Sequence, residues 1–353
     1  IFSKKKPLFL YKYFAVMPRL RHISLSLLGI FLLFSCKDSN YYKLSGYAQG
    51  GTYSVKYRGC RIRPEKLQLK VDSLLREIDF TLSGYNPSST LTRFNAGDTI
   101  TLSPMFFELY SLSYDMWEET DGAFDAACGP LFDIWGFGFK NSEMPSDEHV
   151  RECLAECGTK RLKAPSALKH LVGGKVCGAD FLLPGHTTAP LLNFNAIAQG
   201  YSADIVADML KGYGAEDILV DLGEIYCCGN GPSGKGWTIG IDNPVDGNNS
   251  PGADIKETWN SNGESTGIVT SGNYRKFYIR DGKKYAHTID PRTGYPVSHG
   301  LLSATVTAPT ACRADALATF FMVIGKSQAQ DYMAAHPEIH ACLISDGEVW
   351  NNW

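Results

Sequence analysis

Residues 267–274 read Gly-Ile-Val-Thr-Ser-Gly-Asn-Tyr, an apolar run that ends in small and polar residues. The apolar part predicts a buried strand over 267–270, and the next residues predict a turn. Glycine lets another group approach the backbone closely, and successive N–H groups in such a turn can bind an anion. The stretch therefore predicts a strand followed either by a plain β-turn or by a turn that binds phosphate.

A histidine motif follows. Residues 287–294 read His-Thr-Ile-Asp-Pro-Arg-Thr-Gly, and His287 lies near the end of a strand predicted over 285–289. A histidine can accept a proton near neutral pH, so His287 is a candidate general base. The alternative is a structural histidine that is hydrogen-bonded to backbone. Asp290 precedes Pro291 and could cap that turn.

A third motif, Ala-Asp-Ala-Leu-Ala-Thr at 314–319, falls on a helix predicted over 312–324. Asp315 and Thr319 are four residues apart and share one face of that helix. A carboxylate and a hydroxyl are hard oxygen donors that suit Mg²⁺ or Ca²⁺. The alternative is that Asp315 pairs with an arginine and Thr319 bonds back to its own helical turn.

Two further segments could bind a ligand. Residues 193–200, Asn-Phe-Asn-Ala-Ile-Ala-Gln-Gly, lead into a helix predicted over 199–213, whose first N–H groups could bind phosphate. Ordinary capping of this helix by Asn195 is the alternative. The glycine- and aromatic-rich residues 122–138, and Tyr85 after the Ser-Gly pair 83–84, could contact a flat ring or simply pack in a core.

Composition indicates a globular protein. The chain has 353 residues, a formal net charge of −3 and 44% hydrophobic residues, which excludes disordered and fibrous classes. Basic, aromatic-rich stretches are absent after the N-terminus, so we expect no nucleic-acid binding. Helices and strands are interspersed without regular βαβ units, which predicts an α+β fold with mixed, largely antiparallel sheets and flanking helices. We also expect a hairpin over 41–57, short strands over 168–195 and a polar loop over 246–263.

The N-terminus predicts a targeting segment. Arg19 and Arg21 precede an apolar run over 23–34, and Ser35-Cys36 follows. This ending is similar to a bacterial lipobox, in which the cysteine is acylated; an ordinary secretory signal is the alternative. We therefore predict a signal and lipoprotein segment over 1–36, with Met17 as the natural start, and one domain over 37–353. The anchor would place the protein on the periplasmic face of the bacterial cell envelope.

Ten cysteines would suit disulfides in an exported protein, but their spacings predict no pairing and no zinc site. Cys153 and Cys157 are four residues apart in a helix predicted over 146–158. Most of the other cysteines lie in apolar runs and are expected to be small core residues.

In this order and spacing, the three motifs together resemble the ApbE family of FAD:protein FMN transferases. The resemblance covers roughly residues 51–325. It includes further matches at Gly51-Thr52, the Ser-x-Tyr pattern that ends at Tyr85, Arg93-Phe94-Asn95, Phe124-Asp125 and Gly129-Pro130-Leu131.

The resemblance implies roles for individual residues. Asp315, Thr319 and the backbone carbonyl of Ala196 would hold Mg²⁺, and His287 would be the catalytic base. FAD would be bound by Tyr85, Ala123, Phe124, Asp125, Asn193, Gln199, Ser271, Gly272, Ile289 and Asp290.

The implied reaction transfers FMN from FAD to a Thr or Ser hydroxyl of a partner and releases AMP. The implied partner is an exported flavoprotein subunit of an ion-pumping oxidoreductase. Two alternatives stay open: a Mg²⁺-dependent FAD pyrophosphatase that yields FMN and AMP, and a lipoprotein that binds FAD without catalysis.

The chain departs from the family pattern at several positions. The family usually has Asp at Asn193, Gly at Asn195 and Lys at Gln199. Here Gly50 stands in place of the usual Met, and Gly223-Glu224 stands in place of a Gly-Gly pair. Loss of the lysine removes a positive charge that could meet phosphate, so the affinity for flavin is expected to differ.

Overall fold

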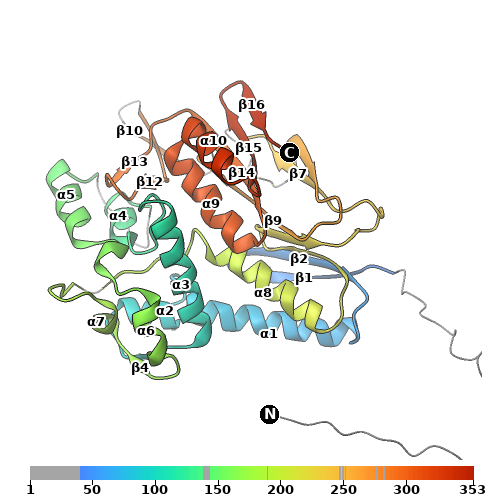
Figure 1. Cartoon of the computed structure of the whole chain (residues 1–353), viewed down its shortest axis with the longest axis horizontal. Coiled ribbons are helices and arrows are strands. Elements are labelled where there is room, and N and C mark those ends of the chain that lie inside the picture. Colours follow the sequence, from blue (N-terminus) through green and yellow to red (C-terminus); the bar gives the residue numbers. More distant parts are fainter. Residues whose placement is uncertain are drawn as a thin grey trace, which may run out of the picture. The chain divides into compact units, whose positions relative to one another are not determined.

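An eight-stranded sheet lies at the centre of the described chain, and every neighbouring pair of its strands is antiparallel (Figure 1). In spatial order its strands are β1 (Tyr42–Ala48), β2 (Gly51–Arg58), β5 (Asp217–Asp221), β6 (Ile225–Cys228), β9 (Thr266–Gly272), β14 (Leu301–Ala308), β15 (His340–Ser345) and β16 (Glu348–Asn351). This computed structural model describes residues 40–137, 144–188, 190–245, 248, 250, 252–274, 277–280 and 283–353. The predicted α+β fold with largely antiparallel sheets is confirmed.

The two faces of the sheet pack against different layers. In β5, Ile218 and Val220 face the main core, whereas Leu219 faces a second cluster, as the two-residue period of a strand requires. Helices α1 (Pro64–Leu82), α8 (Ala198–Gly212) and α9 (Ala311–Ile324) pack on the main-core face. On the other face, Trp237 and Trp259 of the β7–β8 region cover the sheet. Helix α9 is buried on nearly all sides, so its polar residues face either other protein groups or a cavity.

The remaining elements surround these layers. Four two-stranded sheets pair β3 (Ile100–Thr101) with β4 (Lys175–Val176), β7 (Thr238–Asp242) with β8 (Ile255–Asn260), β10 (Phe277–Arg280) with β11 (Lys283–Ala286), and β12 (Ile289–Asp290) with β13 (Tyr295–Pro296). The other helices are α2 (Thr90–Asn95), α3 (Pro104–Glu119), α4 (Gly129–Ile134), α5 (Asp147–Glu156), η1 (Thr159–Arg161), α6 (Pro165–Leu168), η2 (Lys169–Leu171), α7 (Gly178–Phe181) and α10 (Lys326–Ala335).

Local sequence signals explain the best-predicted elements. The turn between β1 and β2 has positive φ at both Gln49 (52°) and Gly50 (81°), the conformation of a two-residue hairpin turn, so the predicted hairpin is confirmed. Ser103 and Ser146 cap α3 and α5, since each side chain accepts a hydrogen bond from a backbone N–H three residues later.

Two predictions of local structure are wrong. Residues 168–195 form short helices and only one two-residue strand, because local bonds such as that from the Cys177 N–H to Asp180 stabilise tight turns. Within the predicted loop 246–263, residues 255–260 form β8. Only Trp259 of that strand is buried, so its composition gives a weak strand signal.

Helices of the described chain include none long and apolar enough to cross a membrane. The predicted signal segment 1–36, including Cys36, lies outside the described residues. The cysteines that the structure does describe are all free thiols.

Candidate active site

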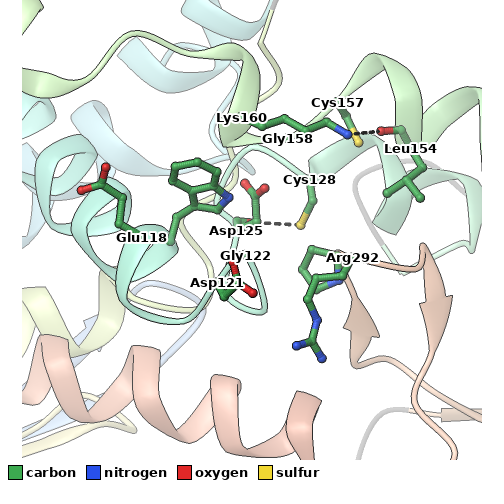
Figure 2. Close-up of a pocket in the computed structure, with 12 residues that line it drawn as sticks. Glu118, Asp121, Gly122, Asp125, Cys128, Leu154, Cys157, Gly158, Lys160 and Arg292 are labelled. Carbon is green, nitrogen blue, oxygen red and sulfur yellow. Dashed lines mark hydrogen bonds between the residues drawn. The ribbon is translucent and has the colours of Figure 1, made fainter.

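A cavity of about 370 Å³ lies where the start of α8, the end of β9, helix α9 and the loop after α3 meet. Segments far apart in the sequence thus contribute to one site. The predicted site residues that line it are Tyr85, Ala123, Phe124, Asp125, Asn193, Ala196, Gln199, Ser271, Gly272, His287, Ile289, Asp315 and Thr319. A neighbouring cavity of about 560 Å³ shares Asp125, Cys128 and Pro291 with this one (Figure 2).

Asp315 and Thr319 both reach the cavity from α9, as their helical spacing predicts. Asp315 is 5% exposed, and its Oδ2 accepts a hydrogen bond from the Gly200 N–H at 3.0 Å. The hydroxyl of Thr319 lies 3.5 Å from that of Ser271 at the end of β9. A carboxylate and two hydroxyls therefore gather at one side of the cavity, next to Ala196 in the segment before α8.

The electrostatics of Asp315 suit a bound cation. Burial, and secondarily the carboxylate of Asp204, raise the pKa of Asp315 to about 7, although the Gly200 N–H acts in the opposite direction. Among the described residues, no donor reaches its second oxygen, and no Lys or Arg lines the cavity. A positive charge here would favour the ionised carboxylate.

The donor chemistry indicates which kind of cation fits. The described residues contain no cluster of three His, Cys, Asp or Glu side chains with metal-binding geometry. Mg²⁺ needs no such cluster, because it binds one or two carboxylates and completes its shell with substrate phosphates and water. The hard oxygens at Asp315 and Thr319 therefore fit Mg²⁺ better than zinc.

Strand β9 continues through Gly272, so the turn predicted after residue 270 is wrong. Ser271 and Gly272 pair with Ala304 and Ser303 of β14, and both line the cavity. A Cβ on Gly272 would lie 2.7 Å from Cε1 of Tyr274 and 3.1 Å from the carbonyl oxygen of Leu302, so this end of the strand has little room for a side chain. Phosphate binding by this segment stays a prediction.

A buried hydrogen bond links Asn273, the residue after β9, to the histidine motif. Thr288 donates its hydroxyl to Oδ1 of Asn273 at 2.7 Å, and both side chains are buried. The bond fixes the backbone next to His287 relative to the end of β9. His287 is half-buried in the cavity, and its ring lies edge-on to that of Phe137 with 6.4 Å between ring centroids.

Asn195, in the segment before α8, does not cap that helix. The residue that caps α8 is Ile197, without a side-chain hydrogen bond, so capping by Asn195 is wrong. Asn195 instead donates its side-chain amide to the Tyr85 hydroxyl at 3.0 Å. Tyr85 is 67% exposed and lines the cavity, where its ring is accessible to a ligand.

Fewer amides of α8 are free than the sequence suggests. The Ala198 N–H donates to the Phe194 carbonyl at 2.8 Å, and the Gly200 N–H donates to Asp315. The start of α8 therefore stabilises the Asp315 carboxylate, and it offers few additional donors to a phosphate.

The carboxylates of Asp125 and Asp290, both predicted to bind FAD, are used within the protein. Asp125 accepts from the hydroxyl of Thr159 at 2.6 Å and from its N–H at 3.0 Å, and burial raises the Asp125 pKa despite these bonds. Asp125 lines the cavity, but Asp290 is not among the lining residues. The Asp290 carboxylate accepts from the guanidinium of Arg292 at 2.9 Å and from the Arg292 backbone N–H at 2.9 Å, and the second bond fits the turn-capping interpretation.

Some lining residues were not anticipated. One of them is Glu224, which lines the cavity two residues after Leu222. The Leu222 carbonyl accepts a hydrogen bond from the side-chain amide of Gln199 at 3.2 Å. The departure from Gly-Gly at 223–224 was the one sequence signal for Glu224. Met322 and Val323 of α9 are likewise outside the predicted site. The other lining residues fall within the segments and motifs described above, although none was assigned to the site individually: Ala126, Cys128, Phe132, Phe137, Asn195, Thr270, Tyr274, Thr288 and Pro291. Their mostly apolar character is typical of a site that binds a ring system.

Known proteins match most of the length of this chain. The model of the ApbE family matches residues 49–343. A FAD:protein FMN transferase of Klebsiella pneumoniae (strain 342) is 33% identical over 315 residues, which cover 88% of this chain and 86% of the relative. A FAD:protein FMN transferase of Vibrio cholerae serotype O1 is 31% identical over 339 residues, which cover 93% of this chain and 96% of that protein.

Solved structures show the same fold. The flavin transferase ApbE from Vibrio cholerae superposes with a TM-score of 0.71 at 28% identity, covering 89% of this chain and 97% of that one. The apo form of the Pseudomonas stutzeri flavinyl transferase ApbE gives a TM-score of 0.72 at 30% identity, covering 89% and 94%. With this coverage in both sequence and structure, the chain belongs to the ApbE family.

Proposed function

We propose that this protein transfers FMN from FAD to a Thr or Ser hydroxyl of a partner protein and releases AMP. The names of the similar proteins support the reaction class. The observation that carries the proposal for this chain is the shared cavity, in which His287 lies together with Asp315 and Thr319. A proton acceptor, a hard-oxygen pair and apolar walls are what phosphoryl transfer from a flavin dinucleotide needs.

FAD is the substrate that fits the lining. The aromatic and aliphatic side chains would pack against its rings, with the accessible ring of Tyr85 at one side. The linking phosphates would lie by Ser271 and Gly272 at the end of β9 and by Asp315 and Thr319, where hydroxyl groups are available. The amide of Gln199 is directed to the Leu222 carbonyl, so it would have to turn to reach a phosphate.

The metal site would be formed by Asp315, Thr319 and the carbonyl of Ala196. When bound there, Mg²⁺ neutralises charge on the linking phosphates and makes AMP a better leaving group. Asp315 must lose its proton for this, so binding of the ion and of a proton compete at that carboxylate.

The chemical step depends on His287. Its imidazole accepts the proton of the acceptor hydroxyl, whose oxygen attacks the phosphorus of the FMN half. The bond between that phosphorus and the oxygen bridging to AMP breaks, and AMP leaves with the bridging oxygen. The products are an FMN phosphoester on the partner, AMP and a proton on His287 that passes to solvent.

The location and the partner extend the proposal. We propose a lipid anchor at Cys36 and an acceptor that is an exported subunit of an ion-pumping oxidoreductase, in the periplasm. The anchor is supported by the order of features in residues 19–36, where two arginines precede an apolar run that ends in a cysteine. Cys36→Ser should move the protein from the membrane fraction to the soluble fraction; an unchanged distribution would exclude the anchor.

One experiment tests the reaction. The protein is incubated with FAD and Mg²⁺, with and without an acceptor domain, and AMP and protein-bound flavin are measured. We expect AMP only with the acceptor, in equal amount to bound FMN. AMP without acceptor would instead indicate a pyrophosphatase, and no AMP in either case would indicate a protein that only binds FAD.

A further inference from the structure

The C-terminal end of α5 carries two thiols on one side. Cys153 lies in the helix, and Cys157 is the residue that directly follows its last residue. Residues four apart in a helix have Cα atoms about 6 Å apart, within the roughly 4.4–6.8 Å range of disulfides. Both cysteines line a cavity of about 200 Å³, so both face the same space.

The two thiols differ in environment. Cys153 is half-buried, whereas Cys157 is only 5% exposed. The neighbouring Cys157 thiol lowers the pKa of Cys153, although burial and Asp133 oppose this. The neighbouring Cys153, together with burial, raises the pKa of Cys157. Of the two thiols, Cys153 is therefore the more accessible to a disulfide.

We propose that Cys153 and Cys157 form a redox-active dithiol whose reactant is the disulfide of a small thiol. The Cys153 thiolate attacks one sulfur of that disulfide, and the first small thiol leaves. The Cys157 thiol then loses its proton and attacks the Cys153 sulfur, so the mixed bond breaks and the second small thiol leaves. In balance, two cysteine thiols are oxidised to one disulfide, and one small-molecule disulfide is reduced to two thiols.

A third thiol, that of Cys128, lines a cavity together with Cys157 but already makes a hydrogen bond within the protein. Figure 2 shows Cys157 and Cys128 in the lining of the same larger cavity. Cys128 is 3% exposed, and its thiol is already bonded to the Asp125 carbonyl at 2.7 Å. We therefore expect oxidation to join Cys153 to Cys157 and to leave Cys128 reduced.

Trypsin digestion makes the test direct, because residues 152–160, Glu-Cys-Leu-Ala-Glu-Cys-Gly-Thr-Lys, form one tryptic peptide with both cysteines. The full chain is treated with oxidised glutathione, and its free thiols are then blocked by alkylation before digestion. We expect this peptide to escape alkylation and to be lighter by two hydrogen atoms than its reduced form. Alkylation of both cysteines, or linkage of either one to Cys128, would overturn the proposal.

Two variants test the order of the steps. In Cys157→Ala, the reaction should stop at a glutathione adduct on Cys153. In Cys153→Ala, buried Cys157 should carry no adduct; an adduct at Cys157 would contradict the assigned roles. Cys60 and Cys177 are also half-buried, and they serve as internal controls that should not form this intrapeptide disulfide. The wild-type peptide decides the question even if a variant folds poorly.

Discussion

Asp204 and Asp315 link two helices: each carboxylate accepts hydrogen bonds from backbone N–H groups in the first turn of the helix on which the other aspartate lies. Asp204, on α8, accepts from the N–H groups of Ala311 and Cys312 at 2.8 Å, and Asp315, on α9, accepts from that of Gly200 at 3.0 Å. The helices meet at Gly200, where a Cβ would lie 2.2 Å from the Ala311 carbonyl oxygen. The packing of α8 on α9 and the candidate metal site therefore depend on the same two carboxylates.

Stability without metal should depend on pH through this pair. Burial raises the pKa of Asp315 to about 7 and that of Asp204 to about 6, so the folded protein keeps protons that the unfolded chain releases. The free energy of unfolding should therefore fall as pH rises from about 4 to about 7. Asp315→Asn should reduce this fall by on the order of 4 kcal/mol.

Urea unfolding in EDTA at pH 5 and pH 8 measures the effect. Asp331→Asn, an exposed position on α10, is the control and should behave like the wild type. An equal pH dependence in wild type and Asp315→Asn would mean that the Asp315 carboxylate is ionised throughout this range.

Magnesium should stabilise the wild type at pH 8 but not Asp315→Ala. At a concentration one hundred times its Kd, a ligand that binds only the folded state adds about 2.7 kcal/mol. Calorimetric titration with Mg²⁺, and thermal unfolding with and without Mg²⁺, measure this effect. Asp315→Ala should also lose the release of AMP from FAD. Full Mg²⁺-dependent turnover in Asp315→Ala would refute the metal assignment.

His287→Ala should separate binding from chemistry. Removing a general base slows a reaction by about 10²–10⁴-fold, whereas flavin fluorescence titration should show FAD affinity close to that of wild type. His170→Ala, at an exposed position in η2, is the matched control and should leave both unchanged. Transfer at the wild-type rate in His287→Ala would remove His287 from the proposed mechanism.

Thr159 does not line the cavity, but its hydrogen bonds should hold Asp125, which does. Thr159→Val keeps the shape of the side chain but removes the hydroxyl that donates to the half-buried Asp125 at 2.6 Å. We expect a loss of about 1–3 kcal/mol in the free energy of unfolding and weaker FAD binding, because Asp125 belongs to the loop that lines the cavity. Thr159→Ser should restore both in urea unfolding and fluorescence titration; a Val variant as stable as the Ser variant would show that the hydroxyl contributes little.

Much of the site could be predicted because its signals are local. Asp315 and Thr319 share a face through helical spacing, and the apolar run at 267–270 lies in the predicted buried strand. The hairpin at Gln49-Gly50 and the capped helices likewise depend on neighbouring residues. Resemblance to a family added the remaining lining residues, which no spacing rule brings together.

The rest of the site depends on contacts between distant segments. Thr159 reaches Asp125 across 34 residues, and Thr288 reaches Asn273 across 15. By contrast, the Asp290 carboxylate bonds locally to Arg292, as the turn-capping interpretation expects, and only the family resemblance implied a contact with FAD. A carboxylate motif predicts which groups are available, whereas tertiary packing decides which of them stay free for a ligand.

The two cavities beside the loop after α3 have a thermodynamic consequence. Asp125, Cys128 and Pro291 line both of them, so these three residues form a wall that the two spaces share. A compound that fills the larger space and displaces this shared wall also reshapes the smaller one. By reciprocity, such a compound and the dinucleotide would alter each other's affinity by the same factor. An inhibitor of this protein therefore need not compete for the flavin's own contacts.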